Sequence, residues 1–539
     1  VRESTSEDTQ GTDEEMNIRK IMTLCVAFVV LVAVNACDVT TEPLSTVTDA
    51  NVFEDAGTYE AFLAKLYAGL SVTGQQGAAG DGDFQRLDEG FSSYGRQLWQ
   101  LQELPTDEAV IAWNDAGLPE LSTQGWASSN QFVQMMYSRV YYQVSLVNEF
   151  LRETTDDVLT SRGQESLMPE VQQFRAEARF LRALSYWHGI DLFGDIPLVE
   201  EDYELNGPPP PQSTRAEVYG FIVDELVAIR NDLPPAGTGQ YGRADQGALS
   251  MLLAKVYMNA GVYVGSDQYS LAMTEIEGII PAYQLATDFD ANFRADNHNS
   301  PEIIFSIPTD GERTQTWGGM TFLIHAQVGG DFMPAGDWGI DGGWWGLRVT
   351  PEFVALFPGA EASADSRQKF WTEGQSLEIE SITNWYDGYA NPKFSNLDGL
   401  GMQGSHPTFP DTDYPMFRLA DAYLMYAELA LRGAGGSTAQ AVGYINQLRE
   451  RAYGDDSGNI TTGDLDLAFV LDERARELYW EGHRRTDLIR YGLFTGSGKL
   501  WSWKGNVQGG AATPDTRDLY PIPASEILAN PNPVQNDGY

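Results

Sequence analysis

The strongest constraint on this chain is a series of segments whose apolar residues recur at helical spacing. In the segment 172–193, Phe180, Leu184 and Trp187 share one face, the pattern of an amphipathic helix. Gly194 and Pro197 follow and end it. Comparable patterns cover 58–70, 132–152, 214–232, 245–260, 269–280, 414–431, 439–453 and 465–491. The chain is therefore predicted to be mostly α-helical.

The predicted helices carry small residues where they would meet one another. These residues are Ala178, Ala183, Ala254, Ala427 and Ala430. Such seams resemble those of tetratricopeptide-like units, in which helix pairs stack because one pair cannot bury its own apolar side. Two stretches, 71–128 and 300–414, lack the helical pattern and are rich in Gly, Asp and Trp. We expect loops there, with one strand over 302–308.

The N-terminal segment has the composition of an export signal. After Met16 come two basic residues, Arg19 and Lys20, and then an apolar run over 21–34. This run is too short for a comfortable membrane span but is typical of a signal peptide. The run ends in VNAC, which resembles a lipobox and makes Cys37 the expected lipidated residue. We expect translation to start at Met16, residues 1–36 to form a leader and signal peptide, and 37–57 a lipidated tether.

Charge and ligand chemistry exclude several classes of function. The formal net charge of −43 repels phosphate backbones, so nucleic acid is not an expected partner. The two cysteines, at 25 and 37, precede the helical region, which leaves no thiolate metal site in the folded part. The five histidines show no metal-binding spacing, and the acidic segment 81–89 lacks the spacing of an EF-hand. We expect no metal and no cofactor.

The conspicuous charged helix 473–490 is expected to be structural. Its acids alternate with arginines, as in Glu473-Arg474 and Glu477. An acid catalyst needs a carboxyl group with a raised pKa, whereas neighbouring arginines lower the pKa of a carboxyl group. We predict a set of ion pairs between helices, and another between Glu177 and Arg182. A surface glycosidase, which needs a carboxylate pair in a cleft, is therefore the least favoured alternative.

Several stretches, taken in order, resemble the SusD/RagB family of outer-membrane lipoproteins. They are 48–70, 174–202 (FRAEARFLRALSYWHGIDLFGDIPLVEED), 241–261, 299–307, 417–431, 472–492 and 518–539. The resemblance covers nearly all of the chain after Cys37. It implies a SusD-like α-helical fold with four tetratricopeptide-like helix pairs, plus a loop-rich ligand-binding face with minor β structure. The N-terminal part would span 58–240 and the C-terminal part 241–539, in one compact unit.

The resemblance also implies a function. A protein of this kind is lipid-anchored to the outer membrane, is exposed on the cell surface and has no catalytic activity. It binds oligomeric nutrients and passes them to a SusC-like TonB-dependent transporter. Glycans are the expected ligand, and peptides are the main alternative.

The loop-rich stretches hold the candidate ligand-binding residues. A flat aromatic ring covers the apolar C–H face of a sugar, while carboxylates or amides bond its hydroxyl edge. The run 329–346, GGDFMPAGDWGIDGGWWG, interleaves such groups with glycines. The candidates are Trp99, Trp113, Trp317, Trp338, Trp344, Trp345, Asp337 and Asp341. The alternative is that these tryptophans pack the loops onto the helices.

Overall fold

The computed structural model describes residues 53, 56–78, 80, 82–84, 87–204, 207–357, 359 and 363–539. The chain divides into two compact units, residues 1–58 and 59–539. The predicted leader, lipidated Cys37 and nearly all of the tether lie outside the described residues. The second unit holds the helical scaffold and the two loop-rich stretches.

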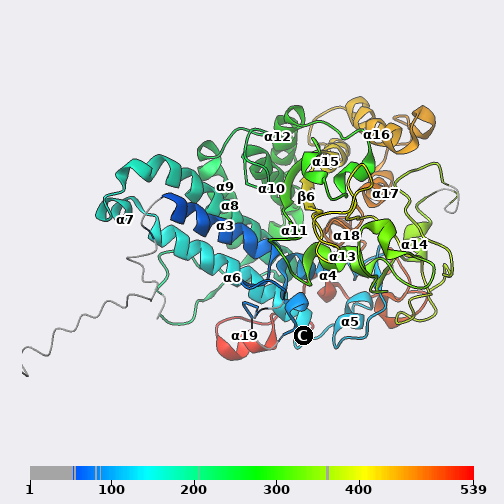
Figure 1. The fold of residues 1–539 in the computed structure, drawn as a ribbon, viewed down its shortest axis with the longest axis horizontal. Helices are drawn as coiled ribbons and strands as arrows, with labels where there is room; N and C mark the ends of the chain where they lie inside the picture. Colours follow the sequence, from blue (N-terminus) through cyan, green and yellow to red (C-terminus); the bar gives the residue numbers. More distant parts are fainter. Residues whose placement is uncertain are drawn as a thin grey trace, which may run out of the picture. The chain divides into compact units, whose positions relative to one another are not determined.

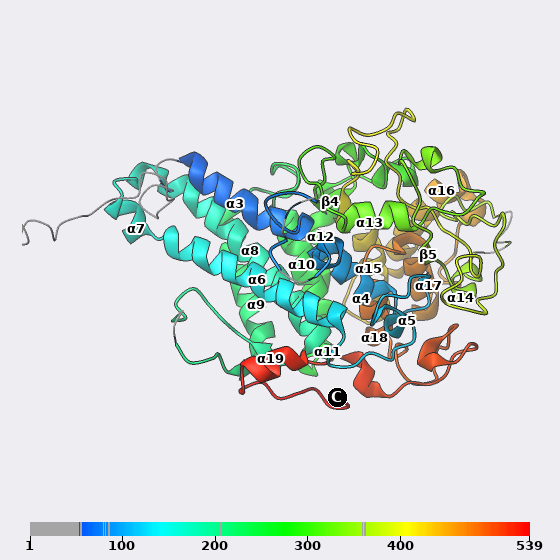
Figure 2. The same ribbon diagram turned by 60° about the horizontal axis from the view of Figure 1, so that its bottom comes forward.

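The first half of this unit is a layer of long helices packed side by side. Figure 2 shows α3, α6 and α8 lying along one another, and α8 also packs on α9 and α10 on α12 (Figure 1). The bounds are α3 Ala56–Ser71, α4 Tyr94–Glu103, α5 Leu118–Ser122, α6 Gln131–Glu153, α7 Asp156–Ser161, α8 Met168–Phe193, α9 Arg215–Ile229, α10 Gln246–Met258, α11 Ala260–Val264 and α12 Tyr269–Ile279. The predicted helix pairs are thus present, and α8 ends at Gly194, as expected.

The second half adds a further group of helices behind a wide region of loops (Figure 1). Helix α15 packs on α12, α16 and α17. The bounds are α13 Gly319–Ala326, α14 Pro351–Val354, α15 Leu419–Leu431, α16 Thr438–Tyr453, α17 Leu467–Leu478, α18 Arg484–Arg490 and α19 Ala524–Ala529. The helix predicted over 465–491 is two helices, because Trp480 and Gly482 between them adopt left-handed φ angles of 62° and 78°.

Strands are short, and each described sheet is a two-stranded antiparallel ribbon. The strand predicted over 302–308 is β4, Ile303–Ile307, which pairs with β6, Tyr414–Arg418. The other ribbons join β1, Val110–Ile111, to β5, Leu347–Arg348, and β2, Ile196–Pro197, to β3, Gln212–Ser213. The β1–β5 ribbon ties the loop-rich stretch 71–128 to the stretch 300–414, and the β4–β6 ribbon joins the two ends of the stretch 300–414.

The predicted ion pairs of the 473–490 segment are confirmed and are buried. Arg418 bonds Glu302, Glu477 and Glu481, all fully buried carboxylates. Other pairs join Arg367 to Glu473 and Glu477, Arg474 to Asp421 and Asp487, Arg484 to Asp107, Arg485 to Asp191, and Arg490 to Glu428. Arg367, Arg476 and Arg449 together lower the pKa of Glu473 to about 2, against burial, which raises it. The network therefore holds charged side chains that bind together elements distant in sequence.

The expected pair between Glu177 and Arg182 does not form. Glu177 instead bonds Arg243 at 2.7 Å, and Arg182 bonds Glu225 at 2.8 Å. Residues five apart on a helix point in different directions, because only positions three and four apart are neighbours on its surface. Both residues therefore tie α8 to other parts of the chain.

Candidate ligand-binding site

Two of the predicted tryptophans are brought together by the β1–β5 ribbon. Val110 pairs with Arg348 and Ile111 with Leu347, and the amide of Ala112 donates to Gly346 O at 2.8 Å. The next residue, Trp113, therefore lies beside the segment that ends the 329–346 loop. Its indole Nε1 donates to the carbonyl oxygen of Trp344 at 2.9 Å.

The β4–β6 ribbon brings in a third tryptophan. Beyond the ribbon, Thr309 N donates to Asp413 at 2.7 Å, and Gly311 N donates to Asp411 at 2.7 Å. The loop 308–318, which carries Trp317 between β4 and α13, is thereby held against the segment that carries Phe409. Their ring centroids are 5.0 Å apart.

The four rings form a continuous series, here called the aromatic row: Trp113, Trp344, Trp317 and Phe409. The centroids of Trp113 and Trp344 are 6.2 Å apart and those of Trp344 and Trp317 are 6.1 Å apart. Trp317 is 40% exposed, and Trp113 and Trp344 are half-buried. The interplanar angles, between 44° and 56°, make the row curved rather than a flat stack. Its last ring, Phe409, is buried, with 8% exposed.

Buried groups fix the row from beneath. The ring of His325, on α13, stacks on Trp344 at 4.6 Å. Its two nitrogens lie 2.5 and 2.8 Å from the carbonyl oxygens of Gly342 and Thr408, so His325 also joins two loops. The guanidinium of Arg96, on α4, lies 4.2 Å from the centroid of Phe322 and 5.6 Å from that of Trp113.

Arg96 is a charged group that forms no ion pair within the described part of the chain. It is 3% exposed, and among the described residues Nε and Nη2 have no hydrogen-bond acceptor. Burial lowers the pKa of Arg96 to about 9, which leaves it cationic at neutral pH. Its contacts with aromatic rings supply part of the missing stabilisation.

Polar groups lie around the aromatic row. The carboxylate of Glu89 accepts the backbone N–H of Trp317 at 2.8 Å and the hydroxyl of Thr73. Asp341, a predicted ligand residue, is exposed and accepts the Thr408 hydroxyl at 2.5 Å. Asn114, next to Trp113, is exposed as well. Acceptors and an amide are thus available beside the rings.

The remaining predicted residues lie elsewhere. Trp99 is fully buried; its indole donates to Trp480 O at 3.0 Å, so its ring packs the core. Trp345 is 46% exposed, but its φ of 57° directs its indole onto Gly329, away from Trp344. Trp338 and Asp337 line a separate groove. The structure therefore unites three of the six candidate tryptophans.

The acids that precede Trp113 do not face the aromatic row. Asp107 is buried and bonds Arg484 at 2.7 Å. Glu103 and Glu108 are buried too, and burial together with their mutual repulsion raises the pKa of Glu103, while burial raises that of Glu108 to about 7. Because these carboxyl groups are enclosed, they cannot act as an acid and a base on a bound ligand.

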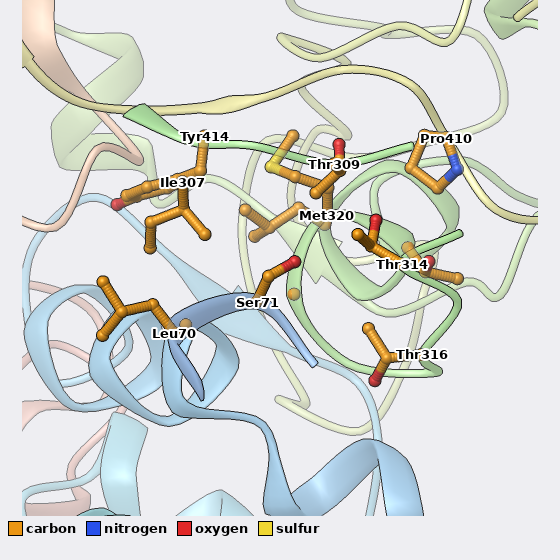
Figure 3. Close-up of a pocket in the computed structure, with 13 residues that line it drawn as sticks. Leu70, Ser71, Ile307, Thr309, Thr314, Thr316, Met320, Pro410 and Tyr414 are labelled. Carbon is orange, nitrogen blue, oxygen red and sulfur yellow. The ribbon is translucent and has the colours of Figure 1, made fainter. Parts of the chain in front are cut away.

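A small cavity lies behind the loop 308–318, which carries Trp317. Figure 3 shows Leu70, Ile307 and Met320 gathered around it, with Thr314 and Thr316 from the loop. Its volume of about 20 Å³ suits a single water molecule rather than a sugar. The cavity therefore belongs to the packing of this loop on the end of α3.

Sequence reasoning missed Phe409, His325 and Arg96. Phe409 lies between two prolines, Pro407 and Pro410, and an aromatic residue in such a rigid turn is a signal that could have identified it. His325 and Arg96 lie in α13 and α4, inside stretches predicted to be loops. No helical pattern there indicated that their side chains would be buried against the rings. Among the described residues, no group of three or more His, Cys, Asp or Glu side chains could hold a metal ion, and no helix is both long and apolar enough to cross a bilayer.

Comparison with known proteins identifies the class of this fold. The pattern of the SusD family matches residues 359–539. The starch-binding protein SusD of Bacteroides thetaiotaomicron is 33% identical, over 97% of this chain and 99% of the relative. A solved SusD superfamily structure from the same organism superposes with a TM-score of 0.69 at 21% identity, covering 89% of this chain and 99% of that one. The surface glycan-binding protein A of B. thetaiotaomicron, solved with laminarihexaose, gives a TM-score of 0.66 at 20% identity, covering 89% of this chain and 99% of that one.

The chain belongs to the SusD family. This confirms both the predicted family and the mostly α-helical SusD-like fold. Members of this family are binding proteins without catalysis, so the protein is not an enzyme. The protein therefore acts by binding a ligand.

Proposed function

We propose that this protein captures glycan oligomers at the cell surface on the aromatic row of Trp113, Trp344, Trp317 and Phe409. The observation that carries the proposal is the row itself. Three tryptophans from separate loops are brought together while remaining partly exposed, Trp317 most of all, although large aromatic rings are usually mostly buried. Such a surface, with acceptors at its edge, matches the alternating apolar and polar faces of a sugar chain.

The relatives support a glycan rather than a peptide. One is named a starch-binding protein and another was solved with laminarihexaose. In addition, the curved row suits successive rings of a helical or bent glucan, whereas a peptide would be expected to use backbone hydrogen bonds at an open sheet edge. The described ribbons β1–β5 and β4–β6 do not offer long edges of this kind.

The setting of the protein is also part of the proposal. Lipidation of Cys37 would anchor the chain to the outer membrane through the tether 37–57, with the binding unit on the cell surface. The bound oligomer would then pass to a SusC-like TonB-dependent transporter. The VNAC sequence and family membership support this setting.

The direct test is calorimetric titration of residues 38–539 with maltooligosaccharides, laminarioligosaccharides and peptides of similar length. We expect saturable binding of one class of glucan. Trp317→Ala should weaken it by on the order of 2 kcal/mol, about thirtyfold in Kd, the usual effect of removing a central aromatic contact. Phe332→Ala is the matched control, since Phe332 is 46% exposed on a neighbouring loop outside the row.

The outcomes separate the parts of the proposal. Equal loss of affinity in both variants would indicate a general effect on the loops and contradict the aromatic row as the site. Binding of peptides alone would contradict the glycan assignment.

A further inference from the structure

A second ligand-sized recess lies beside the aromatic row, here called the Trp338 groove. It is lined by Trp338, Asp337, Asp290, Arg294, Lys369 and Lys393, among others, and has a volume of about 440 Å³. This volume lies within the usual range of small-ligand sites, about 300 to 1,000 Å³. None of the four rings of the aromatic row lines it.

The groove combines an aromatic ring with a free carboxylate. Trp338 is half-buried and is held edge-on against Trp371, with centroids 5.8 Å apart and planes at 75°. The neighbouring Asp337 is exposed. Within the described part of the chain its carboxylate makes no hydrogen bond or ion pair, so it is free to accept one from a ligand.

Most of the other charges of the groove neutralise one another. Lys369 Nζ bonds Asp290 at 2.7 Å, and Arg294 bonds Asp288 at 2.8 Å and Asp290 at 3.6 Å. Lys393 forms part of the floor and bonds the buried Glu481 at 2.7 Å. The lining carboxylates of Asp337 and Asp398 are additional to these pairs, so the groove offers donors and acceptors with a small excess of negative charge. Such a lining favours a neutral, hydroxyl-rich ligand over an anion.

Asn396 connects the groove to the aromatic row. The backbone N–H of Asn396 donates to Trp338 O at 2.9 Å, and its side-chain amide donates to Gly339 O and to His406 O, at 3.0 and 2.9 Å. The ring of His406 lies 5.1 Å from that of Phe409, at the end of the row. Six residues separate Trp338 from Trp344, which limits the distance between their Cα atoms to about 20 Å.

We propose that the Trp338 groove is a second glycan subsite, which takes neutral pyranose units of a chain already held on the aromatic row. The inference rests on the proposed function, because it assigns the groove to the same ligand. Trp338 covers the apolar face of a sugar ring, Asp337 accepts hydroxyl hydrogen bonds, and Lys369 and Arg294, which line the same groove, donate them. A polymer that occupies both sites gains affinity because the second contact is intramolecular.

The experiment compares short and long ligands on the same set of variants. Calorimetry with maltotriose and laminaritriose measures the aromatic row alone. Native gel electrophoresis in the presence of starch or laminarin measures the polymer. We expect Trp338→Ala to leave the Kd of the trisaccharide within about twofold and to weaken retardation by the polymer by at least about fivefold. Trp317→Ala should weaken both.

A second variant distinguishes loss of the subsite from misfolding of the Trp338→Ala protein. Asp337→Ala alters an exposed side chain and should reduce polymer binding in the same direction as Trp338→Ala, at an unchanged melting temperature. Phe332→Ala is the control for truncation of an exposed ring.

Each outcome decides between the two proposals. Unchanged polymer binding by Trp338→Ala and Asp337→Ala, with loss in Trp317→Ala, would overturn the second subsite and leave the proposed function intact. Failure of the unaltered protein to bind any of these glucans would overturn both. Tighter binding of polygalacturonate than of neutral polymers, lost in Trp338→Ala, would overturn the assignment of neutral sugars.

Discussion

Gly346 illustrates how a single residue positions the aromatic row. A side chain at this position would meet the indole of Trp113, with Cβ 2.9 Å from Cε2. Gly346→Ala should therefore displace the Trp113 ring and weaken glycan binding by about tenfold, with a small effect on stability. Calorimetric titration checks the prediction.

The control for Gly346→Ala lies on the same loop. Gly342 has open space where its Cβ would be, so Gly342→Ala should retain affinity. If Gly342→Ala lost as much affinity as Gly346→Ala, flexibility of the loop rather than the Trp113 contact would explain the result.

The buried pair Glu103 and Glu108 should give the protein a pH-dependent stability. The folded state raises the pKa of Glu108 to about 7, chiefly by burial. A raised pKa means that the folded state favours the protonated carboxyl. This contribution to stability is complete below the ordinary pKa of 4.5 and is lost as the pH rises through about 7.

Glu108→Gln removes this titration and should flatten the decline of the free energy of unfolding between about pH 5 and 8. Urea unfolding at a series of pH values measures it. Glu378→Gln, an exposed glutamate, should leave the slope as it is in the unaltered protein. A slope unchanged by Glu108→Gln would show that other groups cause the dependence.

At the scale of elements, the buried arginines hold α15 and α17 to the strands. Arg418 is 1% exposed and lies at the start of α15, where it bonds carboxylates of α17 and of the residue before β4. Removing one partner of a buried ion pair leaves the others uncompensated, at a cost of about 3 to 5 kcal/mol. Arg418→Met should therefore lower the free energy of unfolding by at least this amount.

Arg313→Met provides the comparison, because Arg313 is 82% exposed and pairs only with the half-exposed Asp310. Its removal should change stability by less than about 1 kcal/mol. Urea unfolding measures both variants. Similar losses in the free energy of unfolding would contradict the conclusion that the buried ion pairs stabilise the protein more than exposed ones.

Most of the helices could be predicted from sequence, and the failures have physical reasons. Helix α4 lies within a stretch predicted to be loop. It is buried nearly all round, and polar residues such as Gln97 and Gln100 are interspersed with Leu98, Trp99 and Leu101, so its buried side is not marked by an apolar stripe. The break between α17 and α18 was also missed. It depends on Trp480 and Gly482 in left-handed conformations, and the amide of Gly482 donates to Glu103, a contact no local pattern reveals.

At the scale of the whole molecule, the predicted anchor can be tested apart from the binding site. If Cys37 carries the lipid, Cys37→Ala should abolish incorporation of labelled fatty acid and release the protein from the outer-membrane fraction. Its affinity for glycans should remain unchanged. Retention of the Cys37→Ala protein in that fraction would contradict the anchor, and the variant Cys25→Ala should behave like the unaltered protein.

The candidate site could be predicted only in part, for a reason that applies to the whole molecule. Residue type and loop location pointed to Trp113, Trp317 and Trp344, which the structure brings together. The same criteria selected Trp99, whose ring is buried by contacts with Trp480 and Phe322. Whether a loop tryptophan faces solvent depends on such long-range packing, which composition and spacing do not contain.

The way the aromatic row is assembled has a consequence for the biogenesis of the protein. Trp113 and the residue it bonds are 231 positions apart, and the β1–β5 ribbon that joins their segments is only two residues long. Contacts between such distant positions form late, after the entropy of closing the intervening chain has been overcome. A chain that has folded only its helices would therefore have no glycan affinity. Retention on a glucan matrix would consequently report completed folding, and would separate mature molecules from trapped intermediates of the same mass.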